Sequence, residues 1–192
     1  APELNTAGIV GPIKLQAWDN FKIEDVYVKQ FKLNDSISHL MANVQYQSET
    51  DTDAVYELYI NDSLIEQNPI IPNYELIIPF QIAKPKLWWP HNLGEPYLYD
   101  IKVLVKQGRR ILDSITVKKG LRTIELVTDK DSIGESFYFK VNGVPVYAKG
   151  ANYIPQHGFK NRVEESDYER VLDDVVRANM NMLRVWGGGL YE

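Results

Sequence analysis

The sequence contains no cysteine in its 192 residues. Disulfide bonds and thiol chemistry are therefore excluded, and a zinc site is disfavoured because cysteine is one of the commonest zinc ligands. Histidine is scarce as well: His39, His91 and His157 lie far apart, without the spacing that metal ligands show. We therefore expect no metal site.

Long apolar runs and basic runs are also missing. No apolar stretch approaches the roughly 18 residues that a membrane-spanning helix needs. The net charge of −5 comes from charges of both signs spread along the chain, which argues against nucleic acid and anionic membrane surfaces as partners. The apolar fraction of 44% is sufficient for a real core, so a folded chain is expected.

Residues 22–119 alternate apolar and polar side chains with period two, which is typical of half-buried strands. The runs are rich in valine, isoleucine and tyrosine, and turn residues such as Asn61-Asp62 separate them. About seven short strands in roughly 100 residues predict an immunoglobulin-like β-sandwich over residues 20–121. The predicted strands are 22–29, 39–48, 54–60, 63–66, 74–80, 97–106 and 110–119.

The pattern changes on both sides of this region. Before it, Pro12 to Ala17 alternates like one more strand, so residues 1–19 are interpreted as the tail of a preceding domain or as a linker. After it, residues 123–127 predict a strand, and residues 137–149 predict a hairpin turning at Asn142-Gly143, the strongest two-residue turn signal. Pro145 places the second hairpin strand at a sheet edge, and Gly150 to Asn152 is expected to end it.

A single helix is predicted near the C-terminus. Ser166 and Glu169 have the spacing of a capping box, and Asn179 is expected to end the helix. Residues 182–185 then predict a buried strand, so the last third of the chain forms one right-handed βαβ unit. The apolar stripe of the helix, at helical spacing, comprises Tyr168, Val171, Leu172, Val175 and Val176.

Two stretches are candidate sites. Arg184 and Trp186 stand at the exit of a buried strand, followed by three glycines at 187–189, a pattern that suits the active-site mouth of a β/α barrel. The alternative is a buried ion pair followed by a solvent loop. Trp88-Trp89 followed by Pro90 could be a sugar-stacking platform, but we expect a packing anchor in which both side chains are mostly buried.

Longer motifs carry a family resemblance. Residues 134–152, residues 178–192, the Trp88-Trp89-Pro90 stretch and Gly120-Leu-Arg122 together resemble glycoside hydrolase family 2, and the C-terminal motif is similar to its β-mannosidase branch. Relatives acting on β-galactosides or β-glucuronides usually carry a histidine soon after the arginine, where Trp186 and Gly187 stand here.

The resemblance implies a mainly β piece of a longer protein. Residues 1–19 would end a jelly-roll domain or form a linker, and 20–121 would be the immunoglobulin-like sandwich. Residues 122–192 would be the opening hairpin and first βαβ unit of a truncated (β/α)8 barrel. The segment from about Asn152 to Glu192 is expected either to be held by a neighbouring copy, by exchange or edge pairing, or to pack back on the sandwich in a non-barrel arrangement. In either case Arg184 should be exposed or paired with a substitute acid. The parent would be periplasmic or extracellular in a bacterium and lysosomal in an animal.

The resemblance also implies an activity for the parent. It would hydrolyse terminal β-linked mannose with retention, without metal or cofactor, using two carboxylates roughly 5 Å apart. Both would lie outside this chain, so no catalytic residue is expected in it; Glu164, Glu165 and Glu192 are interpreted as solvated or helix-dipole residues. Arg184 would hold the nucleophilic carboxylate beneath the sugar, with Trp186 lining the pocket.

Asn152 is the third expected substrate-binding residue, at a matching strand end. Two departures from the family pattern are visible: Val10-Gly11 replaces Trp-Arg at the seam with the missing domain, and Tyr153 replaces tryptophan, which could alter the entrance to the sugar site. Two other interpretations remain. One is a non-catalytic sandwich that binds carbohydrate or packs domains, with Trp88 and Trp89 as its platform. The other is a parent acting on another β-glycoside, such as a β-galactoside.

Overall fold

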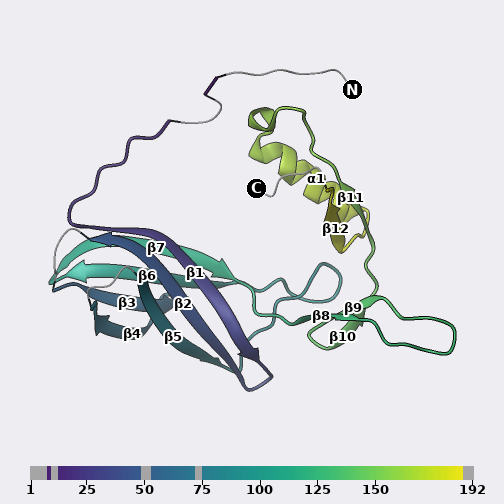
Figure 1. Cartoon of the computed structure of the whole chain (residues 1–192), viewed down its shortest axis with the longest axis horizontal. Coiled ribbons are helices and arrows are strands. Elements are labelled where there is room, and N and C mark those ends of the chain that lie inside the picture. Colours follow the sequence, from purple (N-terminus) through teal and green to yellow (C-terminus); the bar gives the residue numbers. More distant parts are fainter. Residues whose placement is uncertain (1–7, 10–12, 49–52, 72–74, 188–192) are drawn as a thin grey trace. The chain divides into compact units, whose positions relative to one another are not determined.

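The computed structural model describes residues 8–9, 13–48, 53–71 and 75–187. The chain is mainly β and divides into two compact units (Figure 1). One unit runs from Trp18 to Tyr147, and the other takes in the described parts of residues 1–17 and 148–192. Each unit is described by itself.

Seven antiparallel strands of the first unit form a β-sandwich, and every predicted strand of the 22–119 region is present. One sheet has the strand order β1-β2-β5, and the other has the order β4-β3-β6-β7 (Figure 1). The strands are β1 (Phe21–Leu33), β2 (Ile37–Ser48), β3 (Val55–Ile60), β4 (Ser63–Pro69), β5 (Glu75–Ala83), β6 (Tyr99–Gln107) and β7 (Arg110–Lys119).

The core lies between these two sheets because β1, β2, β3, β5 and β6 each bury apolar side chains on one side. On β2, Leu40, Ala42 and Val44 are buried, and β6 buries Ile101, Val103 and Val105 from the other sheet. Successive side chains of a strand point to opposite faces, so this period-two burial follows directly from the sequence alternation. Burial of apolar area stabilises such a core by roughly 25 cal/mol per Å².

A smaller sheet follows the sandwich within the same unit, with strand order β10-β9-β8. Its strands are β8 (Ile124–Val127), β9 (Tyr138–Val141) and β10 (Val144–Val146). The predicted hairpin turn is confirmed, because Asn142 and Gly143 have φ of 51° and 77°, as a type I′ turn requires. Pro145 lies on the edge strand β10, as predicted.

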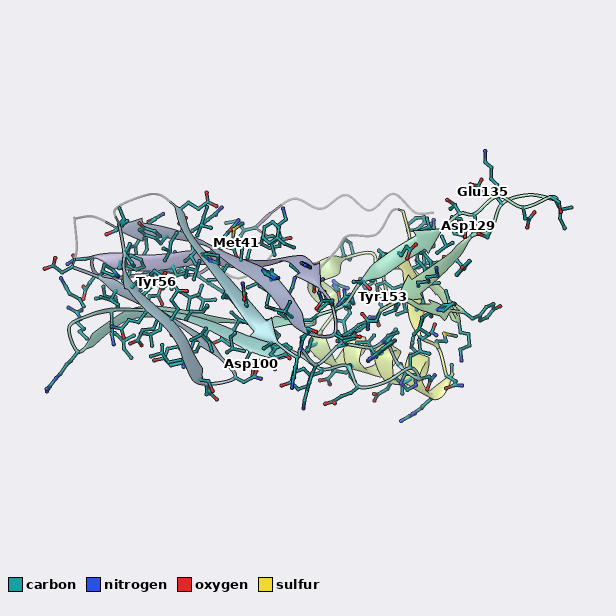
Figure 2. The ribbon with its side chains drawn as sticks, turned by 90° about the horizontal axis from the view of Figure 1, so that it is seen from below. Met41, Tyr56, Asp100, Asp129, Glu135 and Tyr153 are labelled. Atoms are coloured by element: carbon teal, nitrogen blue, oxygen red, sulfur yellow. The ribbon has the colours of Figure 1, made fainter. Side chains whose placement is uncertain are left out.

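The loop from residue 128 to residue 137 connects β8 and β9. Figure 2 shows that this loop, which carries Asp129 and Glu135, projects beyond the strands that it connects. The amides of Ile133 and Gly134 donate hydrogen bonds of 2.8 and 2.7 Å to Asp131 Oδ1. These two bonds favour the ionised carboxylate and lower the pKa of Asp131. The loop is thus closed by a local turn, although it is exposed.

The second unit contains β11 (Gly150–Tyr153), the 3-10 turn η1 (Lys160–Arg162), α1 (Glu165–Arg177) and β12 (Met182–Val185). β11 and β12 pair in parallel, as a βαβ unit requires. The expectation that Gly150 to Asn152 ends a strand was wrong: these residues begin one, and β10 stops at Val146. Within the described residues, no helix is long and apolar enough to cross a membrane.

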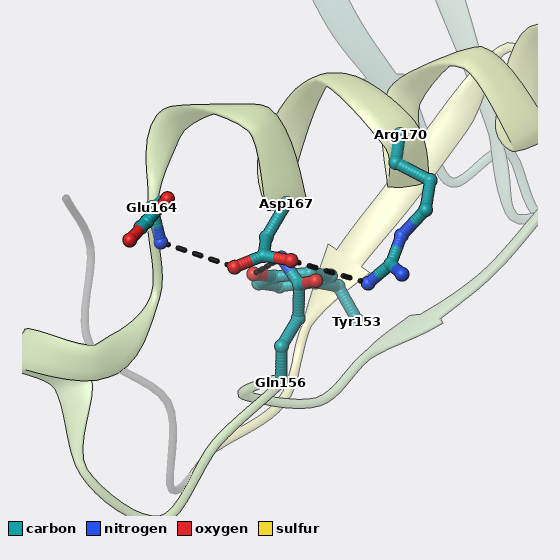
Figure 3. A network of polar contacts seen from close by, with 5 residues as sticks. All are labelled: Tyr153, Gln156, Glu164, Asp167 and Arg170. Carbon is teal, nitrogen blue, oxygen red and sulfur yellow. Dashed lines mark hydrogen bonds and ion pairs between the residues drawn. The ribbon is translucent and has the colours of Figure 1, made fainter.

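The helix start also differs from the prediction. The N-cap is Glu164, in extended conformation, and its amide donates a 3.1 Å hydrogen bond to Asp167 Oδ2 (Figure 3). Ser166 is already inside the helix, so the capping box predicted at Ser166 and Glu169 was wrong by two residues. The capping box is formed by Glu164 and Asp167 instead, and the Asp167 carboxylate at the third helical position accepts from the N-cap amide. Asn179 has φ of 61° and follows the helix end, as predicted.

The predicted strand at 12–17 is not formed by residues 13–17, and Pro12 lies outside the described residues. Ile13 and Leu15 are 81% and 99% exposed. No described strand pairs with this stretch, so its apolar side chains have no surface against which to be buried. The alternation alone predicted a strand here, but a strand forms only where a neighbouring strand pairs with it, and none does so among the described residues.

The sandwich core gives the first testable prediction. Ile101 on β6 is fully buried, whereas Ile111 on β7 is 60% exposed. Ile101→Ala should lower the free energy of unfolding by about 2–5 kcal/mol, because it removes buried methyl groups and leaves a cavity. Ile111→Ala, the matched control, should change it by only about 0.5 kcal/mol. Urea unfolding curves measure both; equal losses would contradict the assigned core.

Candidate functional site

The predicted site residues meet at one edge of the parallel pair. In the register of β11 and β12, Asn152 lies opposite Arg184, and Tyr153 lies opposite Val185. Parallel strands end at the same edge of a sheet, which is where sites of β/α proteins lie. The sequence placed Arg184 and Asn152 at strand ends, and the structure brings them together.

A side-chain hydrogen bond joins the two. Arg184 Nη1 donates to Asn152 Oδ1 at 3.2 Å, and both residues are exposed. Among the described residues, Arg184 makes no ion pair within 4.0 Å. The expectation that Arg184 would be exposed or find a substitute acid is therefore met by exposure, with a neutral amide as its partner. The remaining guanidinium donors can still bind an anion.

Trp186 follows β12 on the same side as Arg184, because residues two apart on a strand share a face. Its amide donates a 2.9 Å hydrogen bond to the Tyr153 carbonyl, which extends the strand pairing past Val185. Its side chain is 48% exposed, so it is not a core residue within this chain. An indole that is half open beside an arginine can supply a stacking surface for a ligand.

Tyr153 lies one residue from Asn152, so its side chain points to the opposite side of β11. There the Tyr153 hydroxyl accepts a 3.2 Å hydrogen bond from Gln156 Nε2 (Figure 3). The departure from tryptophan at this position thus falls on the strand face away from Arg184. On this geometry, it does not change the face that carries Asn152 and Arg184.

Three residues that the sequence analysis did not select hold this strand pair in register. The Lys149 amide donates to Asn181 Oδ1 at 2.9 Å, and the Asn181 amide donates to the Lys149 carbonyl at 2.8 Å. A Cβ on Gly150 would stand 1.9 Å from the Met182 carbonyl oxygen, closer than any real contact. Only glycine therefore fits at the start of β11. The signal in the sequence is Gly150 itself, which the sequence analysis interprets as part of a strand end and not as a strand start.

The acidic residues offer no second site. Glu164 and Glu165 are exposed at the start of α1, in agreement with the prediction that they are solvated or lie near the positive end of the helix dipole. Glu192, Gly188, Gly189 and the Val10-Gly11 departure lie outside the described residues. In the part of the chain that the structure describes, no group of three His, Asp or Glu residues could hold a metal ion.

Trp88 and Trp89 belong to the other unit and are half-buried rather than mostly buried. The Trp88 amide donates to the Leu121 carbonyl at 2.9 Å, and its indole lies 4.4 Å from the Arg122 guanidinium. A Cβ on Gly120 would stand 3.0 Å from the Trp88 ring, and one on Gly94 would stand 2.8 Å from Trp89. Each indole is thus packed on a glycine, which supports the packing-anchor interpretation.

Lys119 stands beside this anchor. Its Nζ donates a 2.8 Å hydrogen bond to the Val28 carbonyl, across the two sheets of the sandwich. Burial lowers the pKa of Lys119, and the nearby positive charge of Arg122 lowers it further. Two cations, Lys119 and Arg122, therefore lie close together at this end of the sandwich, and Arg122 contacts Trp88.

Comparison with known proteins identifies clear relatives. A family model described as Glycosyl hydrolases family 2 matches residues 21–122. A β-mannosidase from Bos taurus is 34% identical over 203 residues, and β-mannosidase B from Aspergillus flavus is 30% identical over 199 residues. Both alignments cover all of this chain but only 23% of the relative.

Solved structures agree with these relatives. The crystal structure of β-D-mannosidase from Dictyoglomus thermophilum matches with a TM-score of 0.81 and 32% identity, covering 92% of this chain and 23% of that one. An exo-chitosanase from Amycolatopsis orientalis matches with a TM-score of 0.69 at 19% identity, which shows a shared fold alone. The chain thus spans less than a quarter of the length of its relatives.

The register of the strand pair gives the second prediction. Gly150→Ala should separate the starts of β11 and β12, because the new methyl group cannot coexist with the Met182 carbonyl. Overpacking of this kind costs on the order of 1–3 kcal/mol, so hydrogen-exchange protection of the Trp186 amide should fall about 10- to 100-fold.

The matched control is Gly134→Ala, where an added Cβ meets no atom within 4 Å. This variant should leave the Trp186 amide protected as in the original chain. Unchanged protection in Gly150→Ala would contradict the described register.

Proposed function

The chain belongs to glycosyl hydrolases family 2, and on that premise we propose that it is a segment of a β-mannosidase that hydrolyses terminal β-linked mannose with retention. The observation that carries the proposal is the exposed Arg184, held by Asn152 beside Trp186 at the carboxyl ends of two parallel strands. Relatives named β-mannosidase cover the whole chain, including these residues.

The proposed division of the chain follows from the same family membership. Residues 20–121 are an immunoglobulin-like sandwich, preceded by the tail of a jelly-roll domain or a linker at 1–19. Residues 122–192 are the opening hairpin and first βαβ unit of a (β/α)8 barrel. The two-sheet sandwich and the parallel β11–β12 pair joined through α1 support this division.

The proposed chemistry assigns no catalytic residue to this chain. Retaining glycosidases need two carboxyl groups about 5 Å apart, one as nucleophile and one as acid/base. Both would come from later barrel strands. Arg184 would bind the nucleophilic carboxylate through charge-assisted hydrogen bonds and keep it ionised, and Trp186 would line the sugar pocket. This chemistry calls for no metal and no cofactor.

A carbohydrate-binding module built on Trp88 and Trp89 is the competing function. Half-buried indoles, each packed on a glycine, speak against an open stacking platform. A β-galactoside-hydrolysing parent is disfavoured by Trp186 and Gly187, which stand where such relatives usually carry a histidine. β-Mannoside hydrolysis therefore remains the proposal.

The third prediction concerns activity. The 192-residue chain should hydrolyse 4-nitrophenyl β-mannoside no faster than background, because it lacks both carboxylates. The longer protein that contains it should hydrolyse this substrate with retention, and the β-galactoside analogue, the matched control, should react much more slowly. Turnover by the chain that survives repurification would contradict the proposal, as would a longer protein that prefers the galactoside.

The fourth prediction concerns association. No residue of α1 is buried, and Leu172 and Val176 are 55% and 48% exposed, so the predicted apolar stripe is only partly covered within this chain. Exposed apolar stripes and open strand edges favour contact between copies. The chain should therefore self-associate at high concentration, and Leu172→Glu combined with Val176→Lys should reduce this. Sedimentation measures the mass; a monomer at every concentration would contradict this prediction.

A further inference from the structure

We infer that Asn152 is a positioning residue for Arg184 and does not contact the sugar. This inference rests on the proposed function, and it replaces the expectation that Asn152 binds substrate directly. The juxtaposition that carries it is the cross-strand pair itself: Asn152 and Arg184 are directly opposite in register, and their side chains are hydrogen-bonded.

The backbone makes this pairing obligatory. Gly150 allows β11 to approach Met182 closely, and the Lys149–Asn181 hydrogen bonds fix the beginnings of both strands. Two residues further along, this register places Asn152 opposite Arg184. The strand pair, and not a flexible loop, therefore positions the Asn152 amide oxygen next to Arg184. Groups held on strands are placed more precisely than groups on loops, and catalysis depends on such precise placement.

The hydrogen-bonding capacity of Arg184 allows it to bind Asn152 and a carboxylate at the same time. Asn152 Oδ1 accepts one hydrogen from Arg184 Nη1, and the guanidinium carries five N–H donors in a rigid fork. With respect to the described residues, the edge formed by Nε and Nη2 is therefore available for a carboxylate, which binds arginine through two parallel hydrogen bonds.

The neutral amide is the suitable partner for this purpose. An asparagine fixes the rotation of the guanidinium without neutralising its charge. An aspartate at the same place would form an ion pair with Arg184 and compete with the incoming carboxylate. The guanidinium thus keeps its full positive charge for a carboxylate bound at the edge formed by Nε and Nη2.

The experiment compares Asn152→Ala and Asn152→Asp in the longer protein, with Asn161→Ala as control. Asn161 is an exposed asparagine of the same unit. Loss of positioning should lower kcat about 10- to 100-fold with KM within about twofold, because a misplaced catalytic partner weakens the transition state more than substrate binding. Asn152→Asp should also lower kcat, and the control should leave both constants unchanged.

A second readout does not depend on activity. In the 192-residue chain, the NMR order parameter of the Arg184 Nε–Hε group should fall in Asn152→Ala and stay unchanged in Asn161→Ala. The Trp186 amide should remain protected in both variants, which shows that the strand pair is intact.

The outcomes separate the two proposals. A raised KM with unchanged kcat would make Asn152 a sugar contact and overturn the inference, as would an unchanged Arg184 order parameter. A longer protein inactive on β-mannosides would overturn the proposed function, while the NMR measurement would still decide the role of Asn152.

Discussion

The close approach of Gly150 to the Met182 carbonyl is the constraint on which the candidate site depends. No other residue fits at this point of β11, because a Cβ would overlap the carbonyl oxygen. The approach sets the register of a parallel pair only four residues long. That register, in turn, decides which side chains of β11 and β12 stand opposite each other. Together with the Lys149–Asn181 hydrogen bonds, this backbone contact places a neutral amide opposite Arg184.

Much of the fold was predictable from the sequence where the period of burial was unambiguous. The seven sandwich strands and the Asn142-Gly143 turn follow from period-two alternation and from a dipeptide that tolerates positive φ. Short elements were less predictable. β11 begins with a glycine, which usually ends an element, and the helix is capped by Glu164 and Asp167 rather than by Ser166. In both cases the local sequence allows more than one start for the element, and the contacts within the folded unit decide which one is used.

The sequence could propose the members of the candidate site, but it could not show the contacts between them. Arg184 and Trp186 stood out as a charged and an aromatic side chain at a strand exit, and Asn152 was added by resemblance. Spacing alone could not show that Asn152 bonds to Arg184, because their separation of 32 residues is closed only by strand pairing. Nor could it show that Tyr153 faces the other side of β11. The face of a side chain depends on the register of the strand, which one residue of slip would reverse.

We propose that the carboxyl ends of β11 and β12 form part of a mannose-hydrolysing site. The most direct measurement is a crystal structure of the longer protein with a mannose-configured inhibitor. We expect the sugar ring beside Trp186, and Arg184 bound to a glutamate from outside this chain, with Asn152 bonded to Arg184 and not to the sugar. An inhibitor bound against Trp88 and Trp89, with no ligand near Arg184, would contradict the account.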